Sequence, residues 1–160
     1  MFAKLAVLAA LVPSILAASH AVTVGANNGL TFTPDTIVAA VGDTITFTVY
    51  VAFPAVNSHG RLTSSSRSVS RNHSITSTHF SGAVCPPPPG GVGPNAFDSG
   101  FLSDLDGSQP TFTYTVVDTA PHFGACMQAA GAHCRAGMTF AINPTASMTY
   151  AQFLANAEAS

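Results

Sequence analysis

A short stretch from Cys126 to Met138 contains three side chains that can bind a metal ion. They are the thiol of Cys126, the imidazole of His133 and the thioether of Met138. One thiolate, two imidazoles and a weak axial thioether form a trigonal site that binds copper and supports electron transfer. A second imidazole is available upstream, in Asn72-His73-Ser74. The residue types and their order therefore predict a copper site.

The same residues could also have roles other than binding copper. Met138 by itself is typical of a core residue that enters a strand. Three other histidines compete for the place of His73: His59, within residues 51–70, and His79 and His122, which we expect to lie on solvated loops. Zinc would accept cysteine and histidine, but a thioether is not among its usual ligands. Asn72-His73-Ser74 is also a glycosylation sequon, which we expect to be coincidental because a glycan there would crowd the site.

The chain has three cysteines, an odd number. In an oxidising compartment thiols tend to pair, so one of the three is left over. Either the remaining cysteine is a stray or buried free thiol, or Cys85 pairs with Cys134 and Cys126 serves as a metal thiolate.

The first 19 residues have the pattern of a secretory signal. Lys4 supplies the positive charge, Leu5 to Leu16 is an apolar run, and Ala17-Ala18-Ser19 offers small residues for cleavage. The run is shorter than the ~20 apolar residues that span a bilayer. We therefore expect a secreted chain, extracellular or in the cell wall, without a membrane span. His20 could bind copper together with a new amino terminus if cleavage exposes it.

The remaining chain of about 140 residues is long enough for one domain with a core. Without Lys4 it has four basic and seven acidic residues, a formal charge of −3. So few cations argue against nucleic acid or anionic lipid as partners. Only 8% of all residues are charged. This composition, rich in Thr, Ser and Val, is typical of an extracellular β-rich domain.

Short strands separated by turns are predicted along the chain. The clearest is Thr44 to Tyr50, where Ile45, Phe47 and Val49 alternate with polar residues. Further strands are expected at residues 20–25, 31–33, 36–40, 111–117 and 138–142. Without a repeating alternation of strands and helices, this pattern favours a Greek-key sandwich.

Three segments do not fit the strand pattern. Residues 85–100 hold four consecutive prolines and are expected to form an irregular loop. Residues 51–70 are rich in serine without apolar periodicity, and we interpret them as a surface insertion or as translated intron. Residues 147–157 have helical spacing, with Ser147 as a possible N-cap.

Taken together, four motifs resemble the cupredoxins, and in particular the secreted fungal plastocyanin-like proteins, which are similar to plant phytocyanins. The motifs are Gly42-Asp43-Thr44, Asn72-His73-Ser74-Ile75-Thr76, a Cys85 followed by Asp98-Ser99-Gly100-Phe101, and His133-Cys134-Arg135-Ala136-Gly137-Met138. The resemblance covers nearly all of residues 20–157 except 51–71. It implies an all-β, Greek-key cupredoxin sandwich with a short C-terminal helix. It also implies one type 1 copper ion held by His73, Cys126, His133 and Met138, and a disulfide between Cys85 and Cys134.

The resulting organisation is a signal peptide at 1–19, a cupredoxin domain at 20–146 with the insertion at 51–70, and a helix with a tail at 147–160. The expected function is that of a monomeric extracellular blue copper protein that transfers single electrons or handles copper. Its partner would be an unidentified redox protein or a cell-wall component, and we expect no enzymatic activity.

Two other functions remain open. Six residues separate Cys126 from His133, whereas two to four are usual in the family, and this difference favours a copper-free wall protein that is structural or binds a ligand. A thiol hydrolase built on Cys126 and a histidine is the third option, but the sequence offers no evident acid to orient the histidine.

Overall fold

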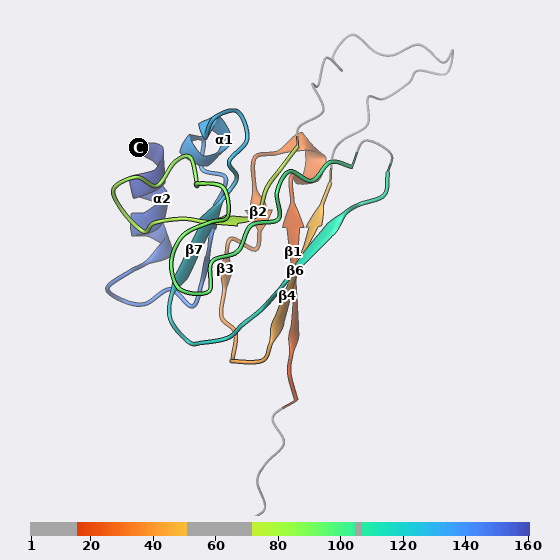
Figure 1. Cartoon of the computed structure of the whole chain (residues 1–160), viewed down its shortest axis with the longest axis vertical. Helices are drawn as coiled ribbons and strands as arrows, with labels where there is room; N and C mark the ends of the chain where they lie inside the picture. The colour runs from red at the N-terminus through yellow and green to blue at the C-terminus, as the bar shows by residue number, and fades with distance from the viewer. Residues whose placement is uncertain (1–15, 51–71, 105–106) are drawn as a thin grey trace, which may run out of the picture.

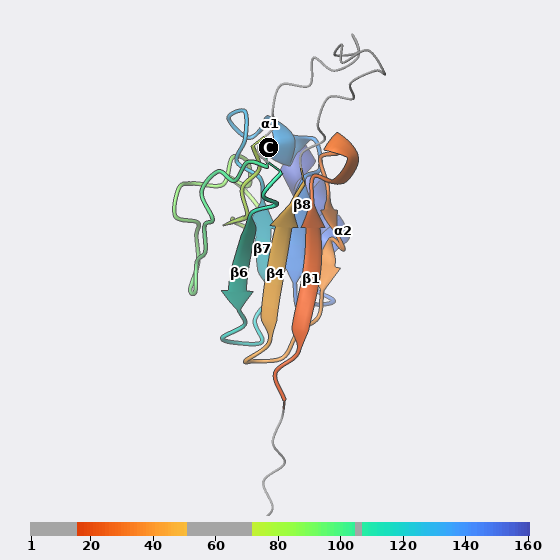
Figure 2. The ribbon, with the colours of Figure 1, turned by 90° about the vertical axis from the view of Figure 1, so that its right-hand side faces the viewer.

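The computed structural model describes residues 16–50, 72–104 and 107–160. Two four-stranded sheets lie face to face, one in the order β2-β1-β4-β6 and the other in the order β3-β8-β7-β5 (Figures 1 and 2). The strands are β1 Ser19–Val24, β2 Phe32–Thr33, β3 Thr36–Ile37, β4 Thr44–Val49, β5 Thr76–Ser77, β6 Thr111–Thr115, β7 His122–Ala125 and β8 Thr139–Ile142. The helices are α1 Ala132–Arg135, α2 Tyr150–Glu158 and the 3₁₀ turn η1 Ala26–Asn28. The expectation of an all-β sandwich with a short C-terminal helix is confirmed.

The first sheet is built on β4, which pairs in parallel with β1 and antiparallel with β6. Alternate residues of a strand point to opposite faces of the sheet. On β4 the side chains of Ile45, Phe47 and Val49 are completely buried, and the threonines between them are half-buried on the other face. The predicted alternation therefore sets which face of this sheet forms the core.

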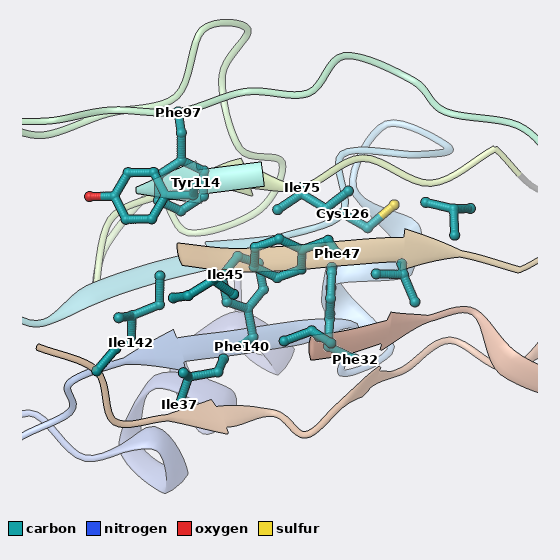
Figure 3. Close-up of a cluster of buried hydrophobic side chains, with 14 of the residues drawn as sticks. Phe32, Ile37, Ile45, Phe47, Ile75, Phe97, Tyr114, Cys126, Phe140 and Ile142 are labelled. Carbon is teal, nitrogen blue, oxygen red and sulfur yellow. The ribbon is translucent and has the colours of Figure 1, made fainter. Parts of the chain in front are cut away.

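Aromatic rings fill the space between the two sheets (Figure 3). The ring of Phe140, from β8, lies 5.0 Å from that of Phe47 and 4.7 Å from that of Phe32 (centroid distances). Both partners belong to the opposite sheet. Rings at these separations bury a large apolar area and join the sheets into one core.

The C-terminal helix α2 covers the outer face of the second sheet (Figure 1). Its Phe153 is completely buried, and its ring lies 4.8 Å from that of Phe123 in β7. The expected N-cap at Ser147 is wrong. Thr149 caps the helix in a capping box with Gln152, in which each side chain accepts a hydrogen bond from the other residue's backbone N–H.

Strands β5 and β7 were not expected from the sequence, and neither was α1. Strand β7 has no apolar–polar alternation because it is buried on both faces, under the core on one side and under α2 on the other. For the same reason His122 is buried in β7, whereas a solvated loop was expected.

Two predicted segments fall mainly or wholly outside the described residues. The secretion signal is described only from residue 16, and the insertion at 51–70 not at all. In the described ranges, no helix has the length and apolar character needed to cross a membrane.

Candidate metal centre

His73, Cys126 and His133 meet at one end of the sandwich. One ligand atom from each lies within 4.8 Å of the others. The Sγ atom of Cys126 is 3.9 Å from Nδ1 of His73 and 3.6 Å from Nδ1 of His133. Both imidazoles thus direct the same ring nitrogen toward one sulfur. All three side chains are buried, and His133 has the largest exposed fraction at 8%.

The second sheet positions Cys126. Strand β7 ends at Ala125, which pairs with Thr139 of β8. The backbone N–H of Cys126 then donates to the carbonyl of Met138 at 3.1 Å. Cys126 therefore continues the β7–β8 ladder by one residue, so its position is set by regular strand pairing rather than by a free loop.

His73 is held by two backbone hydrogen bonds to a distant loop. Its N–H donates to the carbonyl of Leu102 at 3.0 Å and its carbonyl accepts from the N–H of Leu102 at 2.8 Å. Just beyond, Thr76 in β5 pairs with Ala125 in β7. These pairings bring a residue that is 53 positions away in sequence next to Cys126.

The six residues between Cys126 and His133 form a compact turn. Ala129, Ala130 and Gly131 follow one another in the left-handed region, with φ of 55°, 50° and 84°. The N–H of Gly131 donates to the carbonyls of Met127 and Gln128, and α1 begins directly afterwards. One left-handed turn followed by one helical turn brings His133 back to the sulfur. The longer spacing is therefore compatible with a three-residue cluster.

Gly131 also makes close contact between the turn and the proline loop. A Cβ atom at this position would lie 2.9 Å from Cα, Cβ and N of Pro86. Only glycine combines this approach with a φ of +84° at low cost.

Met138 is completely buried in the same core cluster as Cys126. Its carbonyl accepts from Cys126 and its N–H donates to the carbonyl of His133 at 3.0 Å. The backbone of Met138 is thus bonded to two of the three clustered residues. Its role as a fourth ligand remains a proposal.

Ser74 takes part in the site although sequence reasoning did not single it out. Its backbone N–H donates to Sγ of Cys126 at 3.4 Å, and its side chain accepts from the N–H of Met127 at 2.9 Å. Adjacency to His73 was the only signal that could have found it. A sulfur that accepts hydrogen bonds is held in one orientation, and its electron density is reduced.

Burial raises the pKa of the Cys126 thiol above its ordinary value. Hydrogen bonds from the backbone of Ser74 and Gln128 and from the Ser74 side chain oppose this shift in part, because they stabilise the thiolate. Without a metal the thiol form is therefore favoured, and a bound cation would have to displace its proton.

Of the competing histidines, those in the described part of the chain lie apart from this cluster. His79 is exposed, and His59 is outside the described residues. His122 contacts Asp118, with Nε2 and Oδ1 2.8 Å apart. His20 likewise contacts Asp43, with Nε2 and Oδ2 3.0 Å apart. Both of these histidines are thus engaged with carboxylates.

A disulfide joins Cys85 and Cys134, whereas Cys126 is free and buried. Cys134 follows His133 directly in α1. The disulfide therefore ties the helical turn that contains His133 to the proline loop that begins at Cys85.

No family model matches this chain, and no curated protein matches it. Solved structures with a similar arrangement of strands include a mutant plastocyanin of a fern, 21% identical, with a TM-score of 0.46 over 76% of this chain and 96% of that chain. A reduced auracyanin from Roseiflexus castenholzii is 16% identical, with a TM-score of 0.46 over 79% and 95%. A pseudoazurin from Hyphomicrobium denitrificans is 16% identical, with a TM-score of 0.42 over 78% and 73%.

These neighbours are cupredoxins, the family that the sequence resembles. A fungal or phytocyanin-like origin stays a prediction. Because the identities and TM-scores are low, the case for copper rests on the residues of this chain.

Proposed function

We propose that this chain is a secreted type 1 copper protein that carries single electrons or handles copper outside the cell. His73, Cys126 and His133 would be the principal ligands and Met138 the weak axial one. The partner would be a redox protein or a cell-wall component, and the working unit a monomer.

The observation that supports this proposal best is the spacing of the three ligand atoms. A first-row metal ion such as zinc binds cysteine sulfur at about 2.3 Å and imidazole nitrogen at about 2.0–2.1 Å. Bonds of these lengths at tetrahedral to trigonal angles place sulfur and nitrogen about 3.6–3.8 Å apart. The two Sγ–Nδ1 separations here are 3.6 and 3.9 Å. The three side chains therefore fit one ion with little rearrangement.

The donor set favours copper over other ions. A thiolate and a thioether suit Cu(I), and imidazoles suit Cu(II), so one site of this kind can hold both states. Bound copper would supply one-electron chemistry. The chain itself holds the three side chains in place. Strand pairing fixes Cys126, two backbone hydrogen bonds with Leu102 fix His73, and the disulfide anchors the turn that contains His133.

Two features of Cys126 argue against a thiol hydrolase. Its side chain is completely buried, so a substrate could not reach the sulfur without rearrangement of the core. Its raised pKa also lowers the fraction of nucleophilic thiolate. A metal ligand benefits from burial, whereas a nucleophile needs access.

The test is a titration with Cu(II) of the purified, copper-free protein, with its Cys85–Cys134 disulfide intact, followed by visible absorbance. We expect an intense thiolate-to-copper band that saturates at one equivalent. Cys126→Ser should abolish the band, and His79→Ala, which changes an exposed histidine outside the cluster, should leave it unchanged. A wild-type protein that stays colourless at stoichiometric copper contradicts the proposal and supports the copper-free wall protein.

A further inference from the structure

Asp43 is a buried carboxylate that accepts three hydrogen bonds at the end of the sandwich where β4 begins. The backbone N–H of Ala18 donates to Oδ1 of Asp43 at 2.7 Å, and the backbone N–H of Ala40 donates to Oδ2 at 2.9 Å. Nε2 of His20 lies 3.0 Å from Oδ2. The hydrogen bond with His20, followed by those from Ala18 and Ala40, lowers the pKa of Asp43 to about 2.

Within the described chain, which starts at Leu16, backbone hydrogen bonds to the rest of the domain begin at Ala18. Besides its bond to Asp43, the carbonyl of Ala18 accepts from the N–H of Thr44 at 2.9 Å. Ser19 is the first residue of β1 and pairs with Thr44. The described residues before it, Leu16 and Ala17, are exposed, and so are Ala18 and Ser19, so what distinguishes Ala18 is its hydrogen bonds and not its burial. In the described chain, the peptide bond between Ala17 and Ala18 is therefore the point at which backbone hydrogen bonding to the domain begins.

We propose that the chain is processed by hydrolysis of the Ala17–Ala18 peptide bond and that Asp43 binds the new amino terminus. This inference builds on the secretion part of the proposed function but not on copper. One water molecule is consumed as the C–N bond breaks. Ala17 leaves with the carboxylate, and the nitrogen of Ala18 becomes an ammonium group.

The geometry suits an ammonium group better than the amide that precedes cleavage. The nitrogen of Ala18 already lies at the distance of a charge-assisted hydrogen bond from Oδ1 of Asp43. Cleavage would add a positive charge at that position, next to a carboxylate that stays ionised at neutral pH. Ala17 supplies the small residue directly before the cut, although Ile15 stands where the A-x-A pattern has its other small residue.

Cleavage after Ser19, as the sequence pattern alone predicts, would have a different result. It would remove Ala18 and its two backbone hydrogen bonds, and it would remove the first residue of β1. Asp43 would then lose one of its three donors. The fold therefore favours a cut two residues earlier than the small-residue pattern does.

The first experiment is intact-mass analysis and amino-terminal sequencing of the full chain secreted from a eukaryotic host. We expect the mature protein to begin at Ala18. A protein that begins at Ser19 or His20 overturns the inference and leaves the copper proposal intact. A chain that keeps residues 1–17 contradicts both the inference and the secretion part of the proposed function.

The second experiment tests the contact with Asp43. Lys4 is the only lysine of the chain, so a protein that begins at Ala18 has a single amine, its α-amino group. Acetylation with an amine-selective reagent removes that charge. We expect a drop in Tm of about 2–4 °C for the wild type and a much smaller drop for Asp43→Asn.

The matched control is Asp118→Asn, which changes a second carboxylate that contacts a histidine, His122. In this variant acetylation should lower Tm as much as in the wild type. Equal effects of acetylation in Asp43→Asn and in the wild type would overturn the proposed contact.

Discussion

Gly25 leaves the space that the ring of His73 occupies. A Cβ atom at Gly25 would lie 2.6 Å from Nε2 and 2.7 Å from Cδ2 of His73, closer than real contacts allow. Gly25 also has a φ of +73°. Gly25 thus contacts the edge of the ring with Nε2 and Cδ2, which faces away from Cys126, while Nδ1 on the other edge faces the sulfur. Gly25 is therefore a positioning residue for the proposed ligand.

Gly25→Ala should displace His73 and weaken copper binding. The left-handed backbone costs alanine about 1–2 kcal/mol, and the collision with the ring adds to this. We expect copper affinity to fall at least about tenfold, a loss of about 1.4 kcal/mol, as measured by competition with a chelator.

The matched control is Gly82→Ala. Gly82 has a φ of +79°, but a Cβ there would meet nothing within 4 Å. This variant should lower Tm through backbone strain alone and keep copper affinity. Equal losses of affinity in the two variants would show that Gly25 does not position His73.

Met138→Gln should keep the colour of the copper-loaded protein and lower its reduction potential. An amide oxygen is a harder donor than a thioether and stabilises Cu(II) over Cu(I). Voltammetry measures the potential, and Met148→Gln, in the cluster beneath α2, is the control. An unchanged reduction potential would indicate that Met138 is a core residue and not a copper ligand.

Copper binding should become tighter as pH rises. Burial raises the pKa of the Cys126 thiol above its ordinary value of 9.0, so at neutral pH the copper-free protein keeps this proton. Binding releases it, and lower proton concentration favours the bound state. We expect an apparent affinity about tenfold higher at pH 8 than at pH 7. Affinity that does not change over this interval would indicate that the thiol is not a ligand.

Removal of the Cys85–Cys134 disulfide should destabilise the domain. The bridge spans 49 positions, and a closed loop of about 50 residues contributes about 4 kcal/mol in the chain-entropy model. Urea denaturation of the wild type with and without a reducing agent measures this difference.

The double variant Cys85→Ala/Cys134→Ala should match the reduced wild type. It should also bind copper more weakly, because the turn with His133 loses its anchor. Stability that is unaffected by reduction would mean that the pairing adds nothing to the fold.

The sequence alone determined where the four strands of the first sheet and the strands β3 and β8 lie, and which side chains could bind a metal. The alternation of Ile45, Phe47 and Val49 is a local property, because successive side chains of any strand point to opposite faces. Ligand chemistry is also local, since the softness of a sulfur or an imidazole depends on the side chain itself. These features needed no knowledge of distant contacts.

Only the tertiary structure decided where β5 and β7 lie, that His122 is buried, and that Thr149 rather than Ser147 caps α2. Strand β7 could not be predicted from its own sequence, because it is buried on both faces and therefore lacks the apolar–polar alternation that marks a strand. The burial of its outer face comes from α2, which is distant in the chain. The proposed metal centre shows the same limit. The sequence did not show whether the six residues between Cys126 and His133 allow the two side chains to meet. The left-handed turn at Ala129 to Gly131 brings them together. The approach of His73 depends on pairing with Leu102 and on the space above Gly25. Such contacts join residues far apart in the chain, so no local pattern contains them.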